Sequence, residues 1–199
     1  MRERYEGRIA GVGSSSGVRL VVGRWDVSPH GSFADVMVER ADGHRILLAP
    51  SAAVRATVEA TYTFDEVRLE DVTLADTADG WSVRAPSLEL DLTIGSRMPL
   101  GHLLRLVPRP LATSTAWATL LDPVASRVLD GVHTRGAARE GRKEWYGATD
   151  LRAVTAMSGR LDGVALGSLT DVDPPCRFGF SSTPRSPSVT HVVTTIEIA

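Results

Sequence analysis

Residues 87–94, SLELDLTI, alternate strictly between polar and apolar side chains, and this alternation constrains the fold more than any other feature of the chain. Successive side chains of an extended strand point to opposite faces. Four apolar residues therefore share one face of this segment: Leu88, Leu90, Leu92 and Ile94. The pattern predicts a β-strand that packs one face against a core and leaves the other face in water.

The Asp-Gly pairs at residues 42–43, 79–80 and 162–163 separate further apolar runs. Both residue types tolerate the backbone conformations of tight hairpin turns, so each pair predicts a turn between antiparallel strands. The β-branched segment VTHVVTTIEIA, residues 189–199, predicts a long final strand. One face of that strand carries Val192, Thr194, Ile196 and Ile198.

Helical signals are fewer. Residues 50–62 combine Ser51, a candidate N-cap, with apolar residues along one side. Residues 98–108 repeat leucines at helical spacing until Pro108 stops the helix, and residues 117–129 fit either a helix or a strand. We therefore predict a mainly β protein: an antiparallel meander that forms a barrel or a sandwich with one to three short helices. We expect a single β-rich domain over residues 1–199, with a boundary near residue 97 as the alternative.

Charge and cysteine content argue against several classes of partner and cofactor. The chain has 22 basic and 24 acidic residues, with arginines interleaved among acids, so we expect neither nucleic-acid nor membrane binding. The N-terminal segment lacks an apolar leader, and no run approaches the about 18 apolar residues of a membrane span. Cys176 is the only cysteine, which excludes an intramolecular disulfide and paired-cysteine metal motifs. We expect a cytoplasmic protein without a metal or cofactor, and its oligomeric state stays open.

Two familiar motifs are ruled out by their context. The glycine-rich segment GVGSSSG, residues 11–17, precedes a β-branched run, whereas a phosphate-binding glycine loop must open a helix. It predicts a hairpin loop. The chain also lacks the Gly-x-Ser-x-Gly turn that exposes a nucleophilic serine.

A first candidate site lies in residues 23–39, GRWDVSPHGSFADVMVE, where charged and aromatic residues gather around a Pro-Gly turn. A histidine beside carboxylates can exchange protons near neutral pH. The spacing matches no metal motif, and a purely structural turn explains the same residues. As a functional alternative, Arg24 and His30 contribute to the rim of a ligand pocket.

The second candidate site is RKEWYG, residues 142–147, which contains the only lysine of the chain, Lys143. Alternation places Arg142, Glu144 and Tyr146 on one strand face and Lys143 with Trp145 on the other. If the first face points into a barrel, it forms the polar floor of a ligand pocket and Lys143 lies in water. This orientation requires a helix, such as residues 51–62, to shelter Trp145.

The segment EGRKEWYG, residues 140–147, with LLRLVPRPL upstream, resembles the β-rich acetoacetate decarboxylase-like proteins. Their reactive lysine follows a Gly-Tyr/Phe-Pro segment, whereas Lys143 precedes its aromatic pair and adjoins no proline. The resemblance implies an enzyme that forms a Schiff base with a small carbonyl compound at Lys143.

Two functions are therefore predicted as alternatives. The first is a β-barrel-like protein that binds a small apolar or carboxylate ligand through Arg142, Glu144, Tyr146, Arg24 and His30. The second is an enzyme that uses Lys143 as a nucleophile, or Glu144 and Tyr146 as an acid-base pair.

Overall fold

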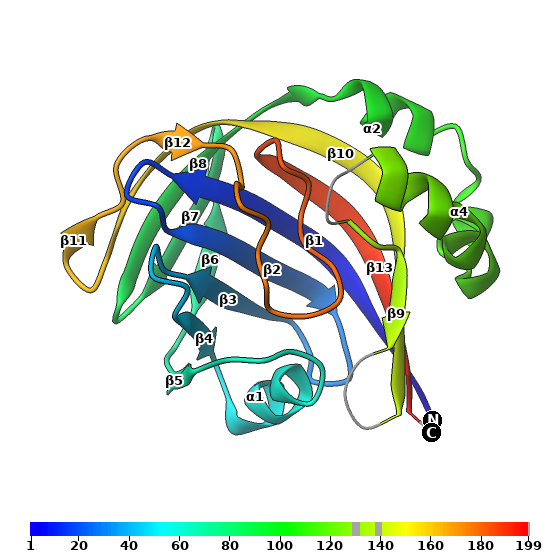
Figure 1. Cartoon of the computed structure of the whole chain (residues 1–199), viewed down its shortest axis with the longest axis horizontal. Coiled ribbons are helices and arrows are strands. Elements are labelled where there is room, and N and C mark those ends of the chain that lie inside the picture. Colours follow the sequence, from blue (N-terminus) through cyan, green and yellow to red (C-terminus); the bar gives the residue numbers. More distant parts are fainter. Residues whose placement is uncertain (129–131, 138–140, 199) are drawn as a thin grey trace.

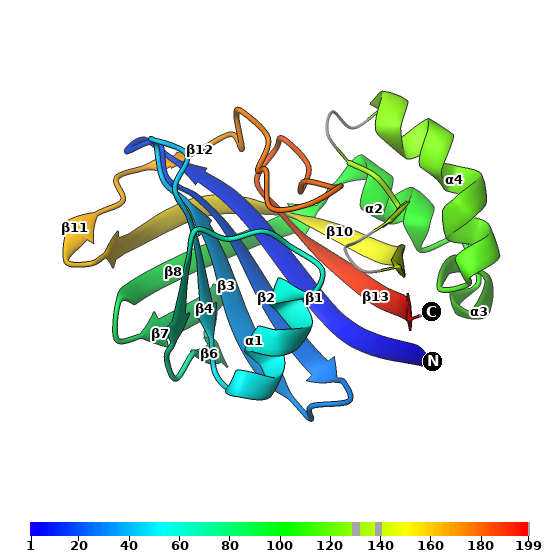
Figure 2. The same cartoon turned by 60° about the horizontal axis from the view of Figure 1, so that its bottom comes forward.

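The computed structural model describes residues 1–128, 132–137 and 141–198 of the chain. Strands account for 51% of the structure and helices for 15%, and the main element is a single curled sheet that forms a half-barrel (Figures 1 and 2). The prediction of a mainly β, barrel-like protein with short helices is therefore confirmed.

Ten strands form the main sheet in the order β5-β4-β3-β2-β1-β13-β10-β8-β7-β6. Their bounds are β1 (Arg2–Ser14), β2 (Arg19–Val27), β3 (Phe33–Glu39), β4 (Arg45–Ala49), β5 (Glu66–Leu69), β6 (Thr73–Asp76), β7 (Gly80–Ala85), β8 (Leu88–Arg97), β10 (Arg142–Leu161) and β13 (Ser188–Ile198). Three short strands pair beside them: β9 (Arg135–Ala137), β11 (Val164–Ala165) and β12 (Leu169–Thr170).

The sheet consists of two meanders joined through strands that are distant in sequence. β1 to β4 follow one another as antiparallel neighbours, and so do β6 to β8. The first and last strands, β1 and β13, pair along most of their length in the middle of the sheet (Figure 1). One pair, β4 and β5, is parallel, so the sheet is mixed. Strands from both sides of residue 97 share it, because β8 pairs with β10.

Local sequence signals account for individual strands and turns. In β8, Leu88, Leu90 and Leu92 are buried, and the alternation prediction is confirmed there. The Asp-Gly pairs at 42–43, 79–80 and 162–163 follow β3, β6 and β10 and connect each of them to the next strand. At residues 162–163 both backbone φ angles are positive, 51° and 77°, which is the conformation that this residue pair tolerates.

In the described part of the chain, four helices lie outside the sheet: α1 (Ala52–Glu59), α2 (Pro99–Leu104), α3 (Arg109–Ala112) and α4 (Thr115–Val128). The Ser51 side chain caps α1 by accepting a hydrogen bond from the Val54 backbone N–H. Of the segment that fitted either a helix or a strand, residues 117–128 are helical and form most of α4, and residue 129 lies outside the described residues. In Figure 1, α2 and α4 lie together beside β10, while α1 lies apart next to β4 and β5.

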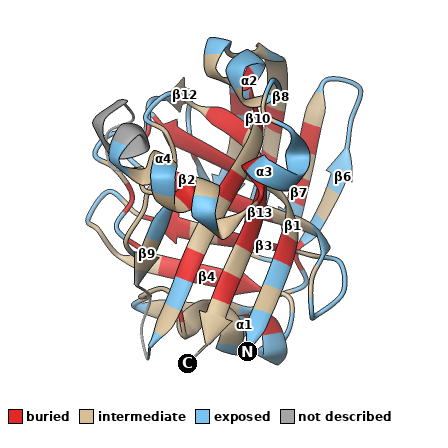
Figure 3. Cartoon of the chain, turned by 90° about the vertical axis from the view of Figure 1, so that its right-hand side faces the viewer, coloured by how far each residue is buried: buried red, intermediate tan, exposed pale blue. Residues whose placement is uncertain are grey.

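The two faces of the central strands have different surroundings. Alternate residues of β1, β2 and β3, including Val12, Leu20 and Val36, join a large hydrophobic core with side chains of β7, β8 and the second half of β10. The opposite residues, among them Ile9 and Val21, line a cavity. Figure 3 shows buried residues following the middle of the sheet, with more exposed residues on the helices at its side.

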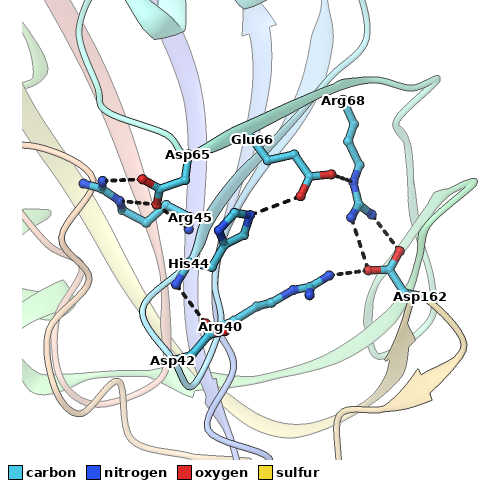
Figure 4. Close-up of polar contacts among 8 residues, drawn as sticks. All are labelled: Arg40, Asp42, His44, Arg45, Asp65, Glu66, Arg68 and Asp162. Carbon is cyan, nitrogen blue, oxygen red and sulfur yellow. Dashed lines mark hydrogen bonds and ion pairs between the residues drawn. The ribbon is translucent and has the colours of Figure 1, made fainter.

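A cluster of ion pairs joins distant parts of the half-barrel at its rim (Figure 4). Asp162, in the turn after β10, accepts from Arg40 and from Arg68 of β5, each at 2.6 Å. His44 and Glu66, 3.2 Å apart, lie next to this group. The rim cluster therefore connects the β3–β4 hairpin, the edge strand β5 and the β10–β11 turn.

Candidate functional site

The candidate site is a cavity of about 490 Å³ on the face of the central sheet opposite the main core. Its floor consists of side chains from β1, β2, β3, β13 and the first half of β10. Residues of α1, of the α2–α4 region and of the loop between β12 and β13 cover it. The wall is mostly apolar, with seven aromatic side chains: Tyr5, Trp25, Phe33, Tyr62, Trp117, Tyr146 and Phe178.

The covering loop, residues 171–187, is fixed to the sheet by a buried carboxylate. Glu39 at the end of β3 is fully buried and pairs with Arg19 of β2 at 3.0 Å. It also accepts from the Arg177 backbone N–H at 2.8 Å and from the Arg177 side chain at 3.1 Å. Arg19 in turn donates to the Pro174 carbonyl. These contacts hold Phe178 and the neighbouring loop residues over the cavity.

Glu144 forms a buried polar cluster with two tyrosines at one end of the cavity. Its side chain is only 3% exposed, and the Tyr62 hydroxyl lies 3.3 and 3.2 Å from its two carboxylate oxygens. The hydroxyls of Tyr62 and Tyr146 are hydrogen-bonded to each other. Tyr146 also stacks on Phe180, with ring centroids 5.6 Å apart. We call Glu144, Tyr62 and Tyr146 the Glu144 cluster.

Burial controls the protonation of this cluster. Desolvation raises the pKa of Glu144 to about 7, although the hydrogen bonds from the tyrosines oppose the shift. Burial and the nearby Glu144 charge raise the pKa values of Tyr62 and Tyr146 well above their usual range, so both hydroxyls stay protonated. Glu144 therefore changes its charge near neutral pH, and the cluster can both accept and release a proton.

A second buried carboxyl, Asp35 of β3, lies elsewhere on the cavity wall. It is 3% exposed and accepts a hydrogen bond from the Trp25 indole N–H at 3.0 Å. Burial raises the pKa of Asp35 to about 7. Gly23 on the neighbouring strand leaves the space that this carboxyl occupies, because a Cβ there would lie 2.3 Å from Oδ1.

Two threonine hydroxyls on the cavity wall have no hydrogen-bond partner among the described residues, those of Thr194 and Thr183. Thr194 is 2% exposed and lies between Tyr5 and Tyr146, its register partners on β1 and β10. A buried hydroxyl without a partner is costly, and such groups in folded proteins usually meet water or a ligand.

The structure separates the residues of the RKEWYG segment onto two faces. Glu144 and Tyr146 line the cavity, and Arg142 lies on the same face of β10 beyond the lining. Lys143 is exposed on the other face. Trp145 also points away from the cavity, and its indole N–H donates to Thr119 of α4 at 3.1 Å. The helix that shelters Trp145 is thus α4 and not residues 51–62, which instead cover the cavity.

The two candidates from residues 23–39 lie at different places. Arg24 points to the main-core side of β2, where it pairs with Asp76 at 2.6 Å and Asp26 at 3.3 Å, away from the cavity. His30 is exposed in the β2–β3 connection and contacts Thr57 of α1 at 2.8 Å. Thr57 is a lining residue, so His30 lies at the rim and outside the lining itself.

Sequence reasoning missed the contributions of Tyr62 and Thr194 to the site. Tyr62 lies 82 residues from Glu144 in the chain, and only the packing of the segment after α1 brings the two together. Thr194 was predicted to share a strand face with Val192 and Ile196, but nothing in that pattern distinguishes a cavity floor from a core. Asp35 and Trp25 both belong to the candidate segment at residues 23–39, but the sequence does not predict the hydrogen bond between them.

Two further kinds of feature, a metal centre and a membrane-spanning helix, are absent from the described residues. Within residues 1–128, 132–137 and 141–198, no group of three or more His, Cys, Asp or Glu side chains is placed to bind a metal ion. No helix in the described part of the chain is long and apolar enough to cross a membrane. Comparisons with protein families, curated proteins and solved structures find no match to this chain.

Proposed function

We propose that this protein binds a small, largely apolar molecule in the cavity. The observation that carries the proposal is the cavity itself: about 490 Å³ lined by aromatic and aliphatic side chains, with a few buried polar groups. Ligand sites for small molecules have this volume and this composition, in which apolar walls supply affinity and isolated polar groups fix orientation. The Glu144 cluster, Asp35 and Thr194 are the orienting groups.

An apolar ligand fits the charges better than a carboxylate does. The lining residues in the described part of the chain include neither arginine nor lysine. Of the predicted arginines, Arg142 lies beyond the lining and Arg24 is paired on the opposite face. A carboxylate placed among Glu144 and Asp35 would have to be desolvated beside like charges.

The test is a cavity-filling substitution with a matched control on the same strand. Ala148→Trp places an indole in the cavity, whereas Ala156→Trp places the same group at an exposed position of β10. A neutral apolar fluorophore, N-phenylnaphthylamine, should bind saturably to the wild type and to Ala156→Trp. Ala148→Trp should bind it at least about tenfold more weakly while both variants unfold cooperatively. Equal binding by both folded variants would refute the proposal.

Acid-base catalysis is a second candidate function, favoured by one observation. Glu144 lines a mostly apolar cavity and its pKa is raised to about 7, and these are the properties of a general base. Lys143 supports no Schiff base in this cavity, because it is exposed on the opposite face of β10. Incubation with small ketones in D₂O should give deuterium exchange next to the carbonyl that is lost in Glu144→Gln. No exchange above the buffer rate would exclude this candidate.

A further inference from the structure

The hydrogen bonds of the Glu144 cluster leave acceptors, and no donor, facing the cavity when Glu144 is ionised. Each tyrosine hydroxyl has one proton. If Tyr62 donates to Glu144, it accepts from Tyr146; if it donates to Tyr146, then Tyr146 donates to Glu144. Both hydroxyl protons are then used within the cluster. What remains free are lone pairs on the Tyr146 oxygen and on the Glu144 carboxylate, so a ligand group that binds here must donate hydrogen bonds.

The two buried carboxyl groups of the cavity wall also favour a ligand that donates hydrogen bonds, because they favour a cation. Glu144 and Asp35 are both buried in the cavity wall, and neither forms an ion pair with the described residues. Arg142 lowers the pKa of Glu144 by its charge alone and does so from outside the lining. Buried carboxylates are normally compensated by a cation. Among the described lining residues there is no lysine or arginine, and the lining His133 lies beside Asp122, so a cationic ligand would supply this charge.

The other residues that line the cavity suit a ligand with a cationic group attached to a hydrocarbon chain. The rings of Tyr5, Tyr62 and Tyr146 lie close to the acceptor groups, and aromatic faces attract ammonium groups that have lost their water. The unpartnered hydroxyl of Thr194, between Tyr5 and Tyr146, can accept another ammonium proton. The aliphatic residues beyond, including Ile9, Val21 and Val192, contact only apolar groups favourably.

We propose that the ligand is an apolar organic amine, bound with its ammonium group against Glu144, Tyr146 and Thr194 and its hydrocarbon body along the apolar wall. This inference rests on the proposed function, since it names the class of the ligand that the cavity takes. Burial raises the pKa of Glu144 to about 7, so part of the free protein holds a proton there near neutral pH, and the arriving ammonium group displaces it to solvent.

Three ligands of equal chain length test the inference by isothermal titration calorimetry near pH 8: octylamine, octanol and octanoate. Octylamine should bind at least about tenfold more tightly than octanol, the size of one charge-assisted hydrogen bond, and octanoate should bind most weakly. Glu144→Gln should reduce the affinity for octylamine about tenfold and leave that for octanol within about twofold. Glu89→Gln, which changes an exposed carboxylate of β8 outside the cavity lining, is the matched control and should keep the preference for the amine.

Three results would contradict the amine inference or the role of the Glu144 cluster. If octanol binds as tightly as octylamine, the amine inference is wrong and the apolar cavity stands. If the preference for the amine is kept in Glu144→Gln, the assignment to the Glu144 cluster is wrong. If none of the three ligands binds the wild type, the inference is wrong, and the N-phenylnaphthylamine test decides separately about the cavity. The ranking of the three ligands on the wild type requires no variant, so a poorly folded Glu144→Gln does not prevent the test.

Discussion

The two faces of the central strands β1, β2 and β3 differ in how tightly their side chains are packed. On one face of β1 to β3, residues such as Val12, Val22 and Val36 are fully buried and contact other apolar side chains from β7, β8 and β10. On the other face the same strands line the cavity and bury Asp35. The first face maximises the burial of apolar surface, which is the main stabilising contribution to folding.

The cavity face lacks stabilising contributions that the packed face has. Empty volume forfeits packing contacts, and buried carboxyls without ion pairs lower stability. Both features occur together on the cavity face, with the unpartnered hydroxyl of Thr194. Four predictions test this contrast, and they are ordered from the largest expected effect to the smallest.

A charge on the packed face should have the largest effect. Leu90 is fully buried in the main core, whereas its neighbour Glu89 is exposed. Leu90→Asp removes apolar contacts and buries an unpaired carboxylate, so we expect a loss of about 4 to 5 kcal/mol in the free energy of unfolding, or failure to fold. Glu89→Ala should change it by less than about 0.5 kcal/mol. Urea denaturation measures both, and similar losses would contradict the assignment of the two faces.

On the cavity face, replacing a buried acid should stabilise the protein at high pH. Glu144 has a pKa of about 7 in the folded protein against 4.5 ordinarily, and Asp35 about 7 against 3.8. At pH values between the ordinary pKa and the folded-state pKa, the folded protein binds more protons than the unfolded chain. The free energy of unfolding therefore falls as the pH rises from about 4 to about 7. The shift at Glu144 corresponds to about 3 kcal/mol. Below this window both states are protonated and the difference disappears.

Glu144→Gln isolates that contribution. The neutral amide has no proton to lose, so the variant should be more stable than the wild type at pH values above the folded pKa and similar to it near pH 4. Thermal unfolding over this pH range measures the difference. If the variant is less stable than the wild type at every pH, burial does not raise the pKa of Glu144 in the folded protein, and the prediction is wrong.

Removal of the unpartnered hydroxyl should have a smaller effect. Thr194→Val keeps the shape of the side chain and removes a polar atom that has no partner among the described residues. We expect the free energy of unfolding to stay constant or rise by up to about 1 kcal/mol. Thr195→Val, on the opposite face of β13, is the control and should change stability by less than about 0.5 kcal/mol. A clear loss confined to Thr194→Val would mean that its hydroxyl is satisfied in the free protein, for example by bound water.

The rim cluster should have the smallest effect, although it forms the most conspicuous set of ion pairs. Asp162 is about one-third exposed, and asparagine tolerates its positive φ angle of 51°. Asp162→Asn removes the pairs with Arg40 and Arg68 and should cost about 0.5 kcal/mol or less, and less still in high salt. Chemical denaturation at two salt concentrations measures this. A loss that is larger and independent of salt would show that the rim holds the half-barrel closed more strongly than exposed ion pairs usually do.

Much of the fold could be predicted from short segments of sequence. The alternation in residues 87–94, the Asp-Gly turns and the Ser51 cap each depend on neighbours within a few positions, and the structure contains all of them. The order of the strands could not be predicted in this way. The pairing of β1 with β13 joins residues almost 200 positions apart, and the parallel pair of β4 and β5 breaks the simple meander.

For the candidate site, the sequence by itself determined which side chains of RKEWYG share a face, because strand geometry permits only one alternation. It also determined that Lys143 and Glu144 lie on opposite faces. Only the tertiary structure decided which face is enclosed, since that depends on where α1, α4 and residues 171–187 pack. It also brought Tyr62 to Glu144, separated Arg24 from the cavity and left Thr194 without a partner. These outcomes follow from contacts between distant segments, which no local pattern encodes.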